Sequence, residues 1–431
     1  MPKLLSTGSW VVVLALSVGA QARVAPRSQA ATQALVQAFR DADTFALKAI
    51  VLLALGERWH PAGTEPVLQA LRDRDVRLRA FALETLVRTG EEGPAMVASR
   101  DLVGELIQKQ LTAKEPYYQE RVREVLGRIF PDGKARSRTE WSTWWFSAAK
   151  TYEPVPWSEP AAEEAGVRGK GGTVAQTLVE RAFDLNAAGL EVAICIDSTG
   201  SMQVAIDQAR DAVEDLVSLL RGIAPKFRLG LVHYRDVTDF SAGAEIRVQL
   251  TQNVAAVHAS LADLRAGGGG DTPEAVEKGL EQALLPAMGW QKTTNKLVVI
   301  VGDAPPHPEN IPIAVELART AHERPFQRKN APTTGKEKSN VRPFVISALA
   351  LNNGSLAAFR EITDAGGGMC VSLAPQGARR GPAEERASAA SRGTKAFVKQ
   401  VLVLSFGSQW RESMDEFVEI YFAYRDAGVF R

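Results

Sequence analysis

Two patterns of hydrophobic and polar residues divide the chain. From about residue 31 to residue 130, apolar residues recur every three or four positions, which places them on one side of an α-helix. From about residue 186, short continuous apolar runs alternate with segments of helical spacing. Continuous runs are typical of strands buried on both faces, and their alternation with helices predicts a parallel sheet covered by helices. The sequence therefore predicts a helical region followed by a doubly wound, mostly parallel α/β domain.

Six apolar runs are predicted to form the strands of the α/β domain. They cover residues 190–197, 227–236, 244–250, 296–303, 343–351 and 368–373. Helical spacing predicts helices at residues 201–223, 254–264 and 273–285, with Pro273 at the first position of the last one. A further amphipathic helix is expected over residues 406–431, packing back on the α/β domain.

The helical region contains a weak internal repeat. Residues 36–57 can be aligned with residues 68–91, and each segment has an Arg-Asp-x-Asp turn, a second apolar helix and a closing Gly-Glu. Asp43 and Asp75 are placed to cap the second helices. This pattern resembles HEAT-type repeats, whose helix pairs stack into a solenoid. We predict a HEAT-like domain over residues 23–150, with an ordinary helical bundle as the alternative.

Two features mark the end of the helical region. Three tryptophans fall within residues 140–146, and we expect them to cover the last hydrophobic face of the repeats. A carbohydrate-binding surface is the alternative interpretation of this cluster. Residues 153–173 are rich in Pro, Gly, Ala and Glu and have no apolar periodicity, which predicts a linker within residues 151–185.

The amino terminus has the pattern of a secretory signal. Lys3 precedes an apolar run over residues 10–18, and small residues lead to Ala22. The run is about half the length needed to span a bilayer, so we expect residues 1–22 to be a signal peptide cleaved after Ala22. A buried amino-terminal helix is the alternative. No later segment combines membrane-spanning length with absence of charge, so we expect a periplasmic or secreted protein without a membrane span.

Composition limits the classes of partner. The chain has 431 residues, a hydrophobic share of 45% and a formal net charge of +1. This balance gives no electrostatic reason to expect nucleic acid or an anionic membrane as a partner. The two cysteines, Cys195 and Cys370, lie in apolar runs and are expected to be packed thiols.

The strand over residues 190–197 ends in a group of oxygen-bearing side chains. Asp197 closes the strand, and Thr199 and Ser201 follow it on either side of Gly200. Functional groups of parallel sheets gather outside the carboxyl ends of the strands, and a glycine permits the sharp bend that lets these side chains converge. A strand-ending Asp before Ser or Thr is also a common helix N-cap, which is the alternative role for Asp197.

Two further loops are predicted to meet the first at this edge. Asp303 follows the strand over residues 296–303, and the glycine-rich segment 267–274 contains Asp271 and Thr272. Carboxylates and hydroxyls without His or Cys are hard oxygen ligands, which favour Mg²⁺ or Mn²⁺ over zinc. Because hydroxyl ligands are neutral and Mg²⁺ retains water, an anionic group from elsewhere can take a coordination position.

These loops resemble the metal-ion-dependent adhesion site of the von Willebrand factor A domain. The family motif DxSxS stands here as Asp-Ser-Thr-Gly-Ser over residues 197–201, with Thr in place of the first Ser. The separate Thr of the family matches Thr272 and its later Asp matches Asp303, while Asp271 is a second candidate beside Thr272. The resemblance covers residues 186–405, and residues 233–236 look similar to the branch that includes von Willebrand-type alpha-kinases.

The resemblance implies a binding module and not an enzyme. We expect a protein partner to supply an acidic side chain to the metal, with the helical repeats as scaffold. The alternatives are a metal-assisted hydrolase using Asp197 and Asp303, and an adaptor for an ATPase like the A domains of metal chelatases. None of the five histidines stands in a recognisable nucleophile motif with Ser or Cys, which disfavours the hydrolase.

Overall fold

The structure is a computed structural model. It describes residues 29–57, 60–89, 98–131, 136–154, 174–238, 241–269, 273–326, 341–373 and 383–430. The predicted signal peptide and residues 155–173 of the predicted linker lie outside the described residues. In the part of the chain that is described, no helix is both long enough and apolar enough to cross a membrane.

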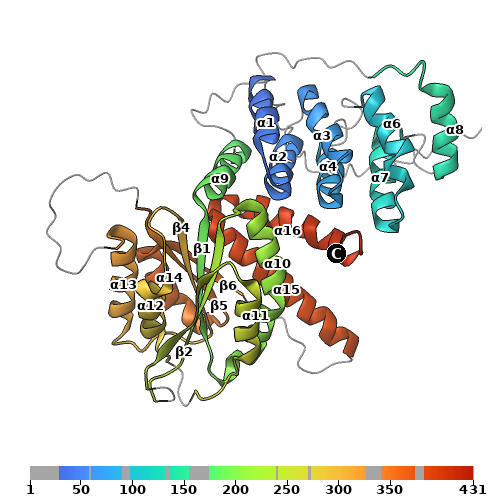
Figure 1. The fold of residues 1–431 in the computed structure, drawn as a ribbon. Helices are drawn as coiled ribbons and strands as arrows, with labels where there is room; N and C mark the ends of the chain where they lie inside the picture. Colours follow the sequence, from blue (N-terminus) through green and yellow to red (C-terminus); the bar gives the residue numbers. More distant parts are fainter. Residues whose placement is uncertain are drawn as a thin grey trace, which may run out of the picture.

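The first part of the chain is helical, as predicted (Figure 1). Its helices are α1 (Gln29–Asp41), α2 (Phe45–Glu57), α3 (Thr64–Leu71), α4 (Val76–Arg88), α6 (Arg100–Gln108), α7 (Pro116–Ile129) and α8 (Arg138–Ala148). Helix α2 is apolar on nearly all sides because α1, α4 and the later helix α9 (Val174–Ala188) pack around it.

The two predicted caps in this region have different outcomes. Asp75 is the N-cap of α4, and its carboxylate accepts a hydrogen bond from the backbone N–H of Arg77 at 2.9 Å. The prediction for Asp43 is wrong. The Thr44 hydroxyl accepts from the N–H of Leu47 at 3.3 Å, while the Asp43 carboxylate accepts from the Asn186 side chain. Because α2 begins at Phe45, Thr44 stands directly before the helix and Asp43 lies one residue too early to cap it.

Helix α8 closes the row of helices with the tryptophan cluster. Trp141 and Trp145 are buried, and the indole nitrogen of Trp145 lies so close to Gly104 of α6 that an added Cβ there would be 3.3 Å away. Phe146 points away from this packing and is 89% exposed. The cluster therefore buries two of its tryptophans against the preceding helices, which is the packing expected of a terminal cap.

The second part of the chain forms a six-stranded sheet of mostly parallel strands in the order β3-β2-β1-β4-β5-β6, which confirms the predicted fold class. The strands are β1 (Leu190–Asp197), β2 (Phe227–Tyr234), β3 (Ala244–Thr251), β4 (Asn295–Gly302), β5 (Phe344–Ala350) and β6 (Gly367–Ser372). Only β3, at one edge, pairs antiparallel with its neighbour.

Helices cover both faces of the sheet. One face packs against α10 (Gln203–Ile223), α11 (Val254–Asp263) and α15 (Ala383–Phe406), and the other against α12 (Val276–Leu284), α13 (Ile311–Glu323) and α14 (Leu356–Ala365). Along β1, Val192, Ile194 and Ile196 enter the first core, and Ala193 and Cys195 the second. This double burial explains the continuous apolar run. Pro273 lies before α12, whose first residue is Val276, so its predicted place inside that helix is wrong.

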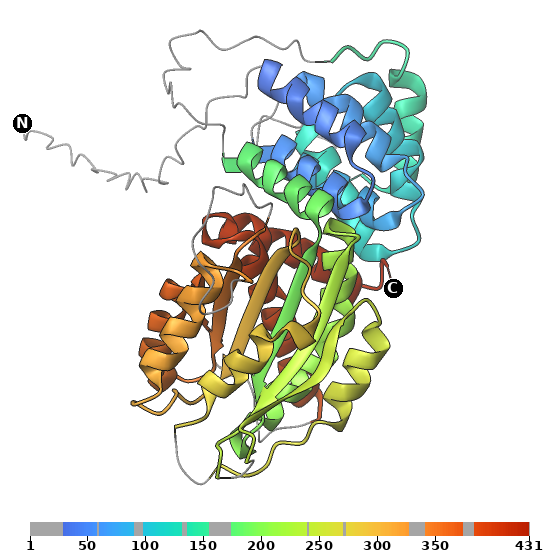
Figure 2. The ribbon, with the colours of Figure 1, turned by 60° about the vertical axis from the view of Figure 1, so that its left-hand side comes forward.

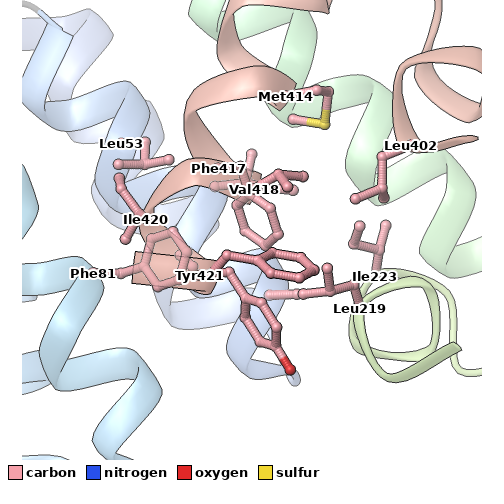
Figure 3. Packing of buried hydrophobic residues seen from close by; sticks show 14 of the residues in the cluster. Leu53, Phe81, Leu219, Ile223, Leu402, Met414, Phe417, Val418, Ile420 and Tyr421 are labelled. Carbon is pink, nitrogen blue, oxygen red and sulfur yellow. The ribbon is translucent and has the colours of Figure 1, made fainter. Parts of the chain in front are cut away.

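The last helix, α16 (Arg411–Asp426), joins the two parts of the chain. Figure 3 shows Phe417 and Val418 between residues of α2 and α4, such as Phe81, and residues of α10 and α15, such as Leu402. The rings of Phe417 and Phe81 are 4.9 Å apart, and the Tyr424 hydroxyl donates to buried Glu84 at 2.7 Å. The expected packing on the α/β domain is present, and the helix packs on the helical region as well. It packs on both regions because its apolar side chains surround much of its circumference.

The helical region lies against the end of the α/β domain at which the strands begin (Figure 2). An added Cβ on Gly222, near the end of α10, would lie 3.0 Å from both Phe45 and Ala46 of α2. Because β1 spans eight residues, its end at Asp197 is about 23 Å from its start at Leu190. The carboxyl edge of the sheet is therefore left uncovered by the helical region.

The shared core predicts coupled unfolding of the two regions. Phe417→Ala should lower the free energy of unfolding by about 3 to 5 kcal/mol, because it leaves a cavity between fully buried rings. Urea denaturation followed by circular dichroism should show one transition that moves as a whole. The control Phe146→Ala removes an exposed ring and should change stability by less than about 0.5 kcal/mol. Two transitions, of which only one moves in Phe417→Ala, would contradict the shared core.

Candidate metal centre at the carboxyl edge of the sheet

Asp197 lies at the end of the central strand β1 and is fully buried. Its Oδ1 accepts hydrogen bonds from the backbone N–H of Thr199 at 2.8 Å and from the Thr199 hydroxyl at 2.7 Å. Helix α10 has Met202 as its N-cap residue, so Asp197 does not cap that helix. The alternative role as an N-cap is therefore not favoured, and the carboxylate holds the turn after β1.

The second oxygen of Asp197, Oδ2, is buried and has no hydrogen-bond partner among the described residues. Burial raises the pKa of Asp197 to about 6, and the charge of Asp303 adds to this rise, whereas the hydrogen bonds from Thr199 lower the pKa. A buried carboxylate oxygen without a donor is costly unless a cation or proton compensates it. This oxygen fits a metal-binding role.

A second buried acid on the same strand shows the opposite arrangement. Glu191 lies near the start of β1, and its Oε1 accepts from Arg228 at 2.9 Å. Its Oε2 accepts from the N–H of Gln291 at 2.9 Å and from the Thr294 hydroxyl at 2.7 Å. Described residues thus donate to both oxygens of the buried acid at the amino edge and to one oxygen of the buried acid at the carboxyl edge.

Asp303 follows β4 directly and lies beside Asp197. The parallel register pairs Ile196 with Val301, so Gly302 lies next to Asp197. An added Cβ at Gly302 would be 2.5 Å from the Tyr234 hydroxyl and 3.5 Å from the Cβ of Asp197. A glycine at this position allows the ends of β1, β2 and β4 to approach closely, which brings two carboxylates to one place.

The remaining predicted ligands have different status. Ser201 lies on the short turn Gly200–Met202 directly after Thr199 and is exposed. Asp271 and Thr272 lie outside the described residues. The glycine loop that carries them is anchored at both ends, since the N–H of Gly200 donates to Gly268 O at 3.2 Å and the N–H of Glu274 donates to Pro305 O at 3.0 Å. The described ends of this segment therefore lie at the first motif and at the loop that contains Asp303.

Glu274 is a third acidic residue that we did not predict as part of the site. Its side chain is 2% exposed, and Oε1 would be 3.8 Å from a Cβ added at Gly269, whose φ is +87°. Burial raises the pKa of Tyr234, and the charges of Asp197, Glu274 and Asp303 raise it further. The sequence could have indicated Glu274 through its position two residues after Thr272. We interpreted that segment as the start of a helix instead.

One correction concerns the histidines. His233 Nδ1 lies 3.0 Å from the Ser198 hydroxyl, a pairing that the sequence did not indicate. Ser198 is fully buried and also accepts a hydrogen bond from Arg235 at 2.8 Å, so it is not an exposed nucleophile. Asp236 and His307 lie in loops at the rim of the site, with 3.2 Å between Oδ2 and Nε2.

The donors fit a hard divalent cation. In the described part of the chain, no cluster of three or more His, Cys, Asp or Glu residues could hold a metal. A metal at this edge would therefore depend on the hydroxyls of Thr199 and Ser201 as well as on carboxylates. Such an oxygen set suits Mg²⁺ or Mn²⁺.

Residues 191–374 match the family described as the von Willebrand factor type A domain. The match and the six-stranded sheet identify this part of the chain as such a domain. Domains of this type are generally protein-interaction modules. The helical region before residue 191 lies outside the match.

Two curated proteins are similar to part of this chain. The alpha-protein kinase vwkA of Dictyostelium discoideum is 28% identical over 123 residues, which are 27% of this chain and 19% of that protein. A putative ariadne-like RING finger protein of Acanthamoeba polyphaga mimivirus is 30% identical over 122 residues, 28% of this chain and 12% of that protein. The chain thus spans less than a fifth of either relative.

Solved structures show similarity at low sequence identity. The SpRpn10 VWA domain is 15% identical, with a TM-score of 0.32, and the match covers 43% of this chain and 88% of that one. BatB from Bacteroides thetaiotaomicron is 14% identical, with a TM-score of 0.31 and coverage of 48% and 100%. The pilus adhesin SpaC from Lactobacillus rhamnosus GG is 12% identical, with a TM-score of 0.29 and coverage of 49% and 30%.

The buried Asp197 predicts a pH-dependent effect of Asp197→Asn in the metal-free protein. The folded-state pKa of about 6 exceeds the ordinary value of 3.8, so the wild type binds this proton more tightly when folded and loses stability as the pH rises from about 4 to about 6. The variant lacks this titration. In EDTA, the melting temperature of Asp197→Asn minus that of the wild type should therefore increase over this range and then level off. A constant difference would contradict the burial of an uncompensated charge.

The close approach at Gly302 predicts a rescue. Gly302→Ala should destabilise the protein by about 1 to 3 kcal/mol, because the new methyl group meets the Tyr234 hydroxyl. Tyr234→Phe removes that hydroxyl, which has no hydrogen-bond partner among the described residues, and should be nearly neutral alone. Urea denaturation of both variants and the double variant should show that Tyr234→Phe recovers much of the loss. Additive effects would mean that the strand ends are further apart than described.

Proposed function

We propose that this protein binds a protein partner through Mg²⁺ or Mn²⁺ held at the carboxyl edge of the sheet. The observation that carries the proposal is the buried Oδ2 of Asp197, which has no hydrogen-bond partner among the described residues and feels the charge of the nearby Asp303. The proposed ligands are Asp197, Thr199, Ser201, Asp303 and Thr272, with Asp271 as the alternative to Thr272.

The charge of the site supports an acidic contribution from the partner. A bound divalent cation would offset the two carboxylates and offer a coordination position to an Asp or Glu side chain. Glu274 lies in the same group of loops and competes with such a carboxylate for the positive charge. The partner's acid and Glu274 together would therefore set the strength of capture.

The arrangement of the two regions supports a scaffold role for the helices. The helical region packs at the amino edge of the strands and leaves the metal edge open. We infer that the mature protein begins after Ala22 and acts in the periplasm or outside the cell, since the amino terminus has the pattern of a secretory signal.

An interaction module is favoured over a hydrolase. Ser198 and His233 form a buried pair, and Arg235 donates a hydrogen bond to Ser198. Among the contacts of the described residues, none places an exposed imidazole beside the carboxylates of Asp197 and Asp303. The relative vwkA is a kinase by name, but the shared segment is 19% of its length, so the name supports no catalytic role here.

The metal can be tested directly by calorimetric titration of the purified protein with Mg²⁺ and Mn²⁺. The wild type should bind one ion, Asp197→Ala should bind none, and Ser201→Ala should bind more weakly because it loses one neutral ligand. Asp263→Ala, at an exposed acid on α11, is the matched control and should bind as the wild type does. Circular dichroism checks that each variant is folded, since Asp197→Ala also removes the acceptor for Thr199.

The same variants test partner capture. Immobilised wild-type protein should retain a partner from envelope extracts in Mg²⁺ and release it in EDTA, and folded Asp197→Ala should retain none. Equal capture by the wild type and Asp197→Ala, with no effect of EDTA, would reduce Asp197 to a structural role.

A further inference from the structure

The segment His233–Asp236, at the end of β2, contacts all three loops of the candidate metal site. None of its residues belongs to the metal-binding motif. The side-chain contacts are, in chain order, His233 with Ser198, Tyr234 with Gly302, Arg235 with Ser198 and Arg265, and Asp236 with His307. The end of β2 is therefore a structural centre around which these loops are arranged.

Arg235 makes the contact that joins two of the loops. Its Nε donates to the Ser198 hydroxyl at 2.8 Å, and its Nη2 donates to the carbonyl oxygen of Arg265 at 2.5 Å. The backbone supports the same junction, because the N–H of Gly267 donates to Ser198 O at 3.1 Å. Arg235 thus ties the loop with Asp197, Thr199 and Ser201 to the start of the glycine loop.

The Ser198 hydroxyl is fully used in this junction. Because Arg235 donates to it, its own proton is left to donate to His233 Nδ1 at 3.0 Å or to Tyr234 O at 3.3 Å. Burial lowers the pKa of His233, which favours the neutral ring that can accept this proton. The side chain between Asp197 and Thr199 is therefore fixed from two sides.

The charge of Arg235 has a second, opposing consequence for a metal. Its guanidinium carries a positive charge that acts on the proposed ligand Asp197 and attracts its carboxylate. The same charge repels a bound cation. Whether Arg235 strengthens or weakens metal binding depends on whether its hydrogen bonds or its charge has the larger effect.

We propose that Arg235 is a positioning residue of the metal site, which raises metal affinity by holding the two loops in one arrangement through its paired hydrogen bonds. This inference rests on the proposed function. The guanidinium has donors in a fixed planar geometry and can reach Ser198 and Arg265 O together, whereas a lysine ammonium is a single point of contact. A lysine at this position keeps the charge and loses the junction.

The test compares Arg235→Lys with the wild type by titration with Mg²⁺. If the junction matters, Arg235→Lys should bind Mg²⁺ about 10- to 100-fold more weakly, the usual effect of removing a residue that orients metal ligands. Ser198→Ala removes the acceptor from the other side of the junction and leaves the arginine charge in place, so it should also weaken binding. Hydrogen exchange in EDTA should be faster in both variants at residues 198–201 and 264–269.

Arg228→Lys is the matched control. Arg228 lies on the same strand at the opposite edge, where its Nε donates to buried Glu191 at 2.9 Å. Arg228→Lys should lower the melting temperature and leave the affinity for Mg²⁺ and the exchange at residues 198–201 unchanged. This separates a general loss of stability from a specific effect on the site.

The outcomes are distinct. Unchanged Mg²⁺ affinity in folded Arg235→Lys, or tighter binding in Arg235→Gln than in the wild type, would overturn the positioning role and leave only repulsion by charge. If the wild type itself binds neither Mg²⁺ nor Mn²⁺, the proposed function fails. Faster exchange in Arg235→Lys with weaker Mg²⁺ binding supports the inference.

Discussion

The parallel pairing of β1 with both β2 and β4 is the constraint on which the candidate site depends. Its register places Asp197 opposite Tyr234 on one side and next to Gly302 on the other. Gly302 lets the three strand ends approach, and Asp303 then follows directly beside Asp197. A shift of one residue in either pairing would turn the core-facing side chains of one strand toward the other face of the sheet, because side chains alternate along a strand.

The same geometry places negatively charged carboxylates close together in a buried environment, which is electrostatically unfavourable unless other groups offset their charge. Asp197 and Glu274 are almost completely buried, and Asp303 lies nearby. At the amino edge, the buried charge of Glu191 is offset by Arg228 and by two further donors. At the carboxyl edge, the charge of Arg235 and the hydrogen bonds of Thr199 act on Asp197, but no residue that the structure describes donates to its Oδ2. Incomplete compensation at one edge is what a cation-dependent binding site requires.

The two parts of the chain are mechanically joined at the other end of the domain. Helix α16 contributes Phe417 to a core shared with α4, and Gly222 of α10 lies against α2. Helix α10 begins directly after the motif that contains Ser201, so one helix connects the carboxyl edge of the sheet to the helical region. The helical region therefore holds the domain from the side opposite the proposed partner.

The sequence by itself determined the strands and turns that depend on residues close together in the chain. The strand bounds agree within about two residues, because burial on both faces demands a continuous apolar run that can be recognised without the fold. Asp197, Thr199 and Ser201 were also recognisable, since their spacing belongs to a single turn. Only the tertiary structure decided that Asp43 contacts α9, that Glu274 joins the acids and that Arg235 reaches Ser198 and Arg265. These contacts join residues about 30 or more positions apart in most cases, and the choice of partner depends on strand order and loop packing, which no periodic pattern encodes.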